Sequence, residues 1–229
     1  MIMNKRNGKT KAMAAALALV GCMSIAGISA YFTDGQAVTN TFTIGSISLE
    51  LLEPGWQAAN GQNVVPEQEI RKDPQIKNDG INDEYVFLEV VLPYASIQTA
   101  NDNGTWNPAA EVELFSYDVN ADWVQVGNSV KNATDKTVTY VYAYGKQDGM
   151  TALKSGATTS ALFDYVRLVN AAEGQNLEGT TVEIVLNAYG IQTTNLNDGD
   201  TTVDGVNSDG KITPEDVWAV VNAKRPALQ

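Results

Sequence analysis

Carboxylate and amide side chains gather in one stretch near the end of the chain, and their spacing would suit a calcium ion. The stretch supplies Asp204, Asn207, Asp209, Lys211 and Asp216. Counted as a twelve-residue calcium loop, the last four take positions 3, 5, 7 and 12, and Gly210 takes position 6, where the chain must turn sharply. Position 1 falls on Gly205, one residue after Asp204, and Asp216 is shorter than the usual Glu. We predict that these residues bind calcium.

A plainer interpretation of the same stretch is a loop of Asp, Asn and Gly residues that is solvated by water. Asp216 would then act only as an acid at the positive end of the dipole of a following helix. The sequence leaves both interpretations open.

The residue types that the sequence lacks restrict the reactions that the domain could catalyse. There is no His, and the one Cys, Cys22, lies in the N-terminal segment. A domain without them has no imidazole base, no thiolate nucleophile, no disulfide and none of the usual zinc ligands. Most familiar hydrolase mechanisms are thereby excluded, and we predict that the protein is not an enzyme.

Two further groups of side chains suggest carbohydrate chemistry. Paired carboxylates for glycoside hydrolysis could come from Glu111, Glu113, Asp118 and Asp122, although alternating acids on a strand usually serve solubility. Three tryptophans fall in or beside expected loops, where an indole ring either stacks on a sugar or covers the rim of a core. They are Trp56, Trp106 and Trp123.

The first thirty residues are typical of an export signal. Four cationic residues precede an apolar run from Ala12 to Ala30, and small residues end it. We predict cleavage between Ala30 and Tyr31, which leaves residues 31–229 as one domain with an acidic loop at 193–212 and a helix at 213–225. No stable membrane span would then remain. Cleavage before Cys22, at the lipobox-like sequence 19–22, is the alternative and would leave a lipid anchor.

Removal of this leader makes the domain more acidic. Lys5, Arg6, Lys9 and Lys11 are lost with no acidic residue, so the formal net charge goes from −12 to −16. A domain of this charge is a poor partner for nucleic acid and for anionic lipid.

Strands must position these groups. Apolar residues recur with period two in short runs separated by Gly, Asn, Asp and Pro, which is the pattern of antiparallel strands with one buried face. The runs are Phe42 to Leu51, Val86 to Leu92, Val112 with Leu114, Val138 to Tyr144, and Val182 to Ala188. With no helix between them, they predict an all-β fold, an antiparallel jelly roll or β-sandwich.

One short helix is expected at the C-terminal end. Thr213 is a good N-cap, Pro214 suits the first helical position, and Val217, Trp218 and Val221 form an apolar face. So short a helix needs tertiary packing to be stable, and we expect it to cover one face of the sheet.

Four stretches, taken in order, carry a resemblance to a known family. They are the segment from Ala30 to Leu49, the segment from Val65 to Val86 with Lys72-Asp73-Pro74, the turn from Leu153 to Phe163, and Asn187 to Gln192 together with Glu215 to Trp218. The sequence thus resembles the TasA/camelysin family of exported proteins, which depend on a signal peptidase of the SipW type. Some camelysin members are described as metalloproteases, but the absence of His argues against that activity here.

The resemblance implies a jelly-roll subunit of extracellular fibres in a biofilm matrix. Residues 38–51 have strand composition and could complete an open sheet edge on a neighbouring copy. The same strand could equally pair within its own sheet. The partners implied are further copies of the chain, the SipW-type peptidase, and matrix polysaccharide or cell wall. The alternative is a monomeric cell-surface adhesion module that binds polysaccharide.

Overall fold

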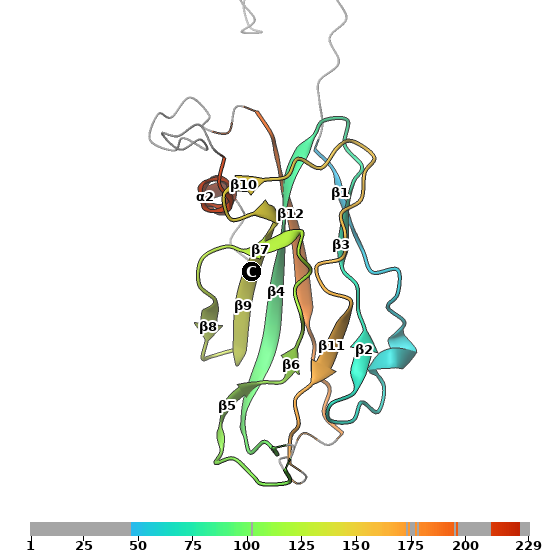
Figure 1. Cartoon of the computed structure of the whole chain (residues 1–229), viewed down its shortest axis with the longest axis vertical. Coiled ribbons are helices and arrows are strands. Elements are labelled where there is room, and N and C mark those ends of the chain that lie inside the picture. Colours follow the sequence, from blue (N-terminus) through green and yellow to red (C-terminus); the bar gives the residue numbers. More distant parts are fainter. Residues whose placement is uncertain are drawn as a thin grey trace, which may run out of the picture. The chain divides into compact units, whose positions relative to one another are not determined.

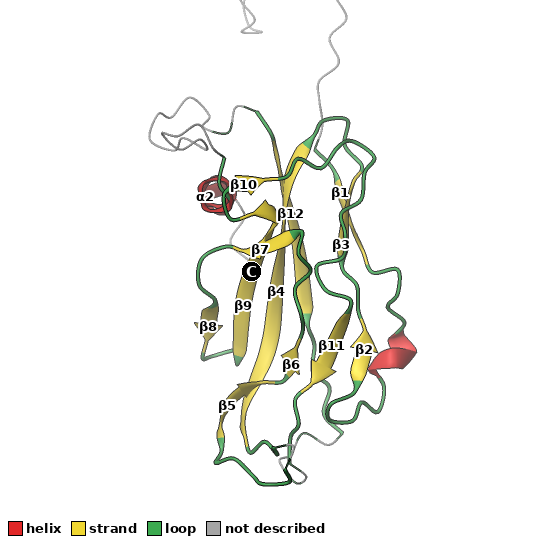
Figure 2. Cartoon of the chain, in the orientation of Figure 1, coloured by secondary structure: helices red, strands yellow, loops and turns green. Residues whose placement is uncertain are grey.

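Strands account for most of the computed structural model of the chain, which describes residues 47–101, 103–172, 174, 177, 179–194, 196 and 212–224. The larger sheet contains β4 (Glu84–Ile97), β5 (Ala110–Glu113), β7 (Trp123–Gln125), β8 (Val130–Asn132), β9 (Thr137–Lys146), β10 (Gly149–Met150) and β12 (Val185–Gln192). A second sheet contains β2 (Glu69–Arg71), β6 (Phe115–Ser116) and β11 (Tyr165–Leu168), and β1 (Leu49–Leu52) pairs with β3 (Gln75–Asn78). The helices of the described residues are the single-turn η1 (Ala58–Gly61) and α2 (Pro214–Lys224) (Figure 2).

The fourteen-residue strand β4 organises the larger sheet. It pairs antiparallel with β12 along one edge, and with β9 and then β5 along the other (Figure 1). Val86, Leu88 and Val90 point to the interior of the sandwich and are fully buried. Each such side chain contributes roughly 1.5–3 kcal/mol through burial. The predicted fold class, an all-β antiparallel sandwich with a short C-terminal helix, is confirmed.

The main core lies between the layers. The interior face of β4 packs with Tyr142 of β9, with Val166 of β11, and with Leu162 and Phe163 from the segment before β11. Leu162 and Phe163 end the stretch from Leu153 to Phe163 that carries part of the family resemblance, and both are fully buried.

Helix α2 covers part of the opposite face of the larger sheet, as the sequence predicts. Val217 and Val221 pack against Tyr85, Phe87 and other residues of the sheet in a second core. The indole of Trp218 lies 5.1 Å from the Phe87 ring and 5.5 Å from that of Tyr189, measured between ring centroids. This half of β4 is therefore buried on both faces, whereas the period-two pattern predicts only one buried face.

Strand positions agree with the sequence better than strand ends do. Residues 180–184 are not in a strand, so the last predicted strand begins at Val185 and not at Val182. Leu114 lies just outside β5 but is buried at 3% exposure. Of the first predicted strand, Leu49 and Leu51 lie in β1, Ile47 precedes it, and Phe42 and Ile44 lie outside the described residues. None of the helices in the described part of the chain is long and apolar enough to cross a membrane.

Candidate functional site

Most of the predicted calcium loop lies outside the described residues. Asp204, Asn207, Asp209 and Lys211 are among these, as are Ala30 and Tyr31 at the predicted cleavage site. The described member is Asp216, in the first turn of α2. Its carboxylate accepts a hydrogen bond from the Thr213 hydroxyl, and that hydroxyl accepts one from the Asp216 backbone N–H at 3.4 Å. Thr213 is thus the N-cap that the sequence predicts.

The structure brings together two of the four carboxylates considered for glycoside chemistry. Glu111 and Glu113 lie on β5 and line one groove. Asp118 lines a smaller neighbouring cavity, and Asp122 lies apart, where it accepts a hydrogen bond from the Ser160 hydroxyl at 3.0 Å. The four residues therefore do not form a single acidic site.

The groove that holds Glu111 and Glu113 has a volume of about 790 Å³. One wall is the interior face of the larger sheet, from β4, β5, β8 and β9, and the other comes from β6, β11 and neighbouring loops. Its charged and phenolic members are Glu67, Tyr94, Glu111, Glu113, Tyr117, Lys131, Tyr140, Tyr142 and Arg167. We call this the tyrosine groove.

Hydrogen bonds fix the phenols of the tyrosine groove. The Tyr140 hydroxyl donates to Glu113 Oε1 at 2.6 Å, and burial together with this carboxylate raises the pKa of Tyr140 to about 12. The Tyr117 and Tyr142 hydroxyls share a hydrogen bond of 3.0 Å. Burial raises the pKa of both, and Tyr117 also stacks on Phe163. All three phenols are therefore neutral near pH 7.

Charged groups of the groove are largely paired. Lys131 Nζ lies 2.6 Å from Glu111 Oε2, and the hydrogen bond raises the pKa of Lys131 and lowers that of Glu111. The same ammonium group lies 4.2 Å from the centre of the Tyr94 ring. Arg167 pairs with Glu69 at 2.5 Å.

Sequence patterns do not identify this groove. Its walls come from strands far apart in the chain, and Tyr140 and Tyr142 have the spacing of ordinary core residues. The one available signal is that two consecutive interior positions of β9 are Tyr, whose hydroxyl groups need partners when buried.

The three tryptophans have different environments. Trp123 is the first residue of β7, directly after a turn; it is buried, donates to the Ser160 carbonyl at 3.1 Å and packs on Tyr144, so of the two uses considered it covers the core. Trp56 lies under the Lys72 ammonium group at 4.9 Å. Trp106 is 56% exposed. Only Trp106 therefore remains an open aromatic platform.

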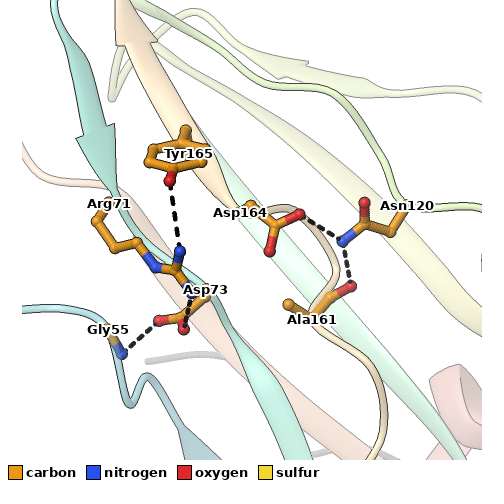
Figure 3. A network of polar contacts seen from close by, with 7 residues as sticks. All are labelled: Gly55, Arg71, Asp73, Asn120, Ala161, Asp164 and Tyr165. Carbon is orange, nitrogen blue, oxygen red and sulfur yellow. Dashed lines mark hydrogen bonds and ion pairs between the residues drawn. The ribbon is translucent and has the colours of Figure 1, made fainter.

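The Lys72-Asp73-Pro74 stretch forms the corner between β2 and β3. Asp73 is 2% exposed; it accepts hydrogen bonds from the Gly55 N–H at 2.8 Å and from Arg71 at 3.2 Å. Arg71 in turn donates to the Tyr165 hydroxyl at 3.4 Å (Figure 3). Nearby, Asn120 donates to Ala161 and Asp164. These contacts join segments of the sandwich, and we assign them a structural role.

The second candidate site is a sheet edge. Among the strands that the structure describes, β12 pairs only with β4. Within the described residues, strand β1 likewise has one partner, β3, with which it pairs through Leu49 to Leu52. The two strands approach at Gly190, where an added Cβ would lie 2.7 Å from Leu49 Cδ1.

A buried carboxylate marks the same place. Glu84 is fully buried; its Oε1 accepts the Ser48 N–H at 3.2 Å, and its Oε2 has no hydrogen-bond partner among the described residues. Burial raises the pKa of Glu84. The start of β1 is therefore hydrogen-bonded to a carboxylate whose ionised form is disfavoured by burial.

Comparison with known proteins identifies a family. Residues 5–176, well over half of the chain, match the sequence profile of a family described as camelysin metallo-endopeptidase. A comparison with proteins of curated function finds no match. Within the described part of the chain, no three His, Cys, Asp or Glu side chains lie close enough together to hold a metal ion.

Proposed function

Because the chain belongs to the camelysin metallo-endopeptidase family, which is associated with the cell surface and the extracellular space, we propose that it is a secreted structural subunit. Copies would assemble into extracellular fibres or matrix after export and removal of residues 1–30 by a peptidase of the SipW type. The family membership confirms the resemblance to TasA and camelysin seen in the sequence.

The observation that carries this proposal is the composition of β12. Its sequence, Val-Leu-Asn-Ala-Tyr-Gly-Ile-Gln, contains neither a charged residue nor a proline. Sheet proteins usually protect an edge strand with Lys, Pro, a bulge or a cover, because the open backbone groups would otherwise pair with another chain. An eight-residue neutral edge on a chain of net charge −12 lacks the charge and the proline that discourage such pairing.

Side chains hold this edge in a fixed register. Asn187 and Tyr189 both donate hydrogen bonds to Glu89 Oε1 on β4, at 3.0 and 3.2 Å. A preorganised edge loses less conformational entropy when a further strand is added, which favours β-augmentation.

The donor strand is best placed in the residues before β1. Residues 49–52 pair with β3 of their own sheet, so this end of the proposed donor segment 38–51 is already used within the subunit. Residues 38–46 of the segment lie outside the described part of the chain. Ile47, the first described residue, is 43% exposed. We infer that the segment up to Ile47 adds to β12 of a neighbouring copy, since the backbone N–H and carbonyl of Ser48 are bonded within the subunit.

We further propose that the protein has no protease activity, despite the description of its family. A zinc protease normally holds its metal with histidines, and the chain has none. The described residues also contain no cluster of acidic side chains that could replace these histidines. They therefore do not fit a catalytic zinc ion. Cleavage of casein by pure protein, abolished by a chelator, would overturn this proposal.

A charge on β12 tests the assembly. Val185 is 44% exposed, and Val185→Asp should raise the concentration at which light scattering detects assembly at least about tenfold, because an unpaired carboxylate disfavours an added strand. Val130→Asp is the matched control, since Val130 is 66% exposed on β8. Equal effects of the two substitutions would count against the β12 edge.

A further inference from the structure

The interior face of the larger sheet changes character along β4. Val86, Leu88 and Val90 meet the second layer in an apolar core, but at Leu92 and Tyr94 the same face lines the tyrosine groove. Register places Glu113 of β5 directly opposite Tyr94. A sandwich normally fills this position with apolar side chains. Here it holds phenols and charges around an open volume, which is the form of a binding site.

The charges of the groove favour a neutral ligand. Its lining contains three carboxylates and two cationic groups, which nearly cancel. Lys131 is already paired with Glu111, and Arg167 with Glu69 outside the lining. An anionic ligand would be repelled by the carboxylates of the lining. A cationic ligand would compete with Lys131 and Arg167 for the carboxylates that these two residues already pair with. An apolar ligand would leave all of these groups desolvated without partners, which is costly.

The remaining polar groups suit hydroxyl groups on the ligand. Tyr140 and Glu113 present a phenol and a carboxylate joined at 2.6 Å, and each keeps further hydrogen-bonding capacity. Tyr94 is 4% exposed, and its buried hydroxyl finds no hydrogen-bond partner in the part of the chain that the structure describes. A sugar hydroxyl both donates and accepts, and the C–H face of a sugar ring packs on an aromatic ring.

We propose that the tyrosine groove binds a neutral, hydroxyl-rich glycan, with Tyr140 and Glu113 as its central contacts. The volume of about 790 Å³ has room for a short oligosaccharide segment. A peptide strand is a poorer fit, because an extended peptide is recognised through the backbone of a sheet edge. The edge strands that line the groove among the described strands, β5, β6 and β8, are only four, two and three residues long.

The test uses purified protein and a panel of neutral oligosaccharides of different linkages, with an anionic and a cationic oligosaccharide for comparison. Binding is followed by NMR, through shifts of the amide signals of Glu111, Glu113 and Lys131. We expect neutral members to bind. We expect Tyr140→Phe, which removes one hydroxyl and keeps the ring, to weaken binding about fivefold, and Tyr140→Ala to weaken it at least about tenfold.

Two control variants complete the experiment. Tyr165→Ala removes a 45% exposed tyrosine outside the groove and should change the affinity by less than about twofold. Trp106→Ala removes the exposed aromatic ring of the loop and should likewise change the affinity for the glycan by less than about twofold. Val185→Asp should leave glycan binding intact, so failed assembly and failed binding are separate results.

Three outcomes would overturn the proposal. The first is that no neutral oligosaccharide binds at concentrations up to about 10 mM. The second is that binding survives both Tyr140 substitutions and is lost with Trp106→Ala. The third is that a synthetic peptide of residues 31–46 shifts the groove signals and displaces the sugar, which would make the groove a peptide site.

Discussion

Removal of the Trp218 indole should destabilise the sandwich, because this ring joins α2 to the sheet. Trp218 is partly buried, packs in the second core and contacts the rings of Phe87 and Tyr189. If roughly 100–150 Å² of apolar surface is lost, at about 25 cal/mol per Å², Trp218→Ala costs about 3 kcal/mol. Such a loss is a large fraction of the stability of an ordinary domain.

Urea denaturation measured by far-ultraviolet circular dichroism provides the assay. Trp218→Ala should lower the midpoint without changing the slope, as expected for a change in stability alone. Trp106→Ala is the matched control: this ring is 56% exposed, and its loss should cost no more than about 0.5 kcal/mol. Equal midpoints for the two variants would refute the role of α2 as a structural cover.

Three other positions give further predictions. Gly190→Ala should cost about 1–3 kcal/mol in thermal unfolding, because its Cβ would crowd β1, whereas Gly149→Ala, with open space around it, should be nearly neutral. The raised pKa of Glu84 stabilises the fold below the ordinary pKa of about 4.5, and this contribution is lost as pH rises through the folded value. Glu84→Gln should therefore gain stability relative to the natural chain between about pH 4 and pH 7, and a constant difference would contradict this. Calcium should raise the melting temperature of the natural chain but not that of Asp209→Ala, which removes the ligand at position 5, and equal shifts of the two chains would contradict the calcium site.

Local patterns in the sequence predict those elements whose signal, a regular alternation of buried residues or a helix cap, lies within the element itself. The alternation from Val86 to Leu92 identifies β4, and the cap at Thr213 identifies the start of α2, because both signals lie within a few residues of the element. The start of β12 is missed, since Val182 and Ile184 continue the alternation although the chain there makes no ladder.

Features that depend on distant contacts are not predictable in this way. Phe87 and Tyr85 of β4 are buried because α2, more than a hundred residues later, packs over them. The tyrosine groove requires β5, β8 and β9 to present polar groups toward β6, and no single stretch reveals that arrangement. The burial of Glu84, whose Oε2 has no hydrogen-bond partner among the described residues, likewise depends on β1 lying beside β12.

Electron microscopy of residues 31–229 beside residues 47–229 tests the central claim most directly. Both forms keep every described strand, and only the first keeps residues 38–46 of the proposed donor segment. We predict ordered filaments from residues 31–229, and folded monomers from residues 47–229 and from a form that retains the leader. Filaments of the same form from residues 47–229, or a persistent monomer of residues 31–229, would contradict the account.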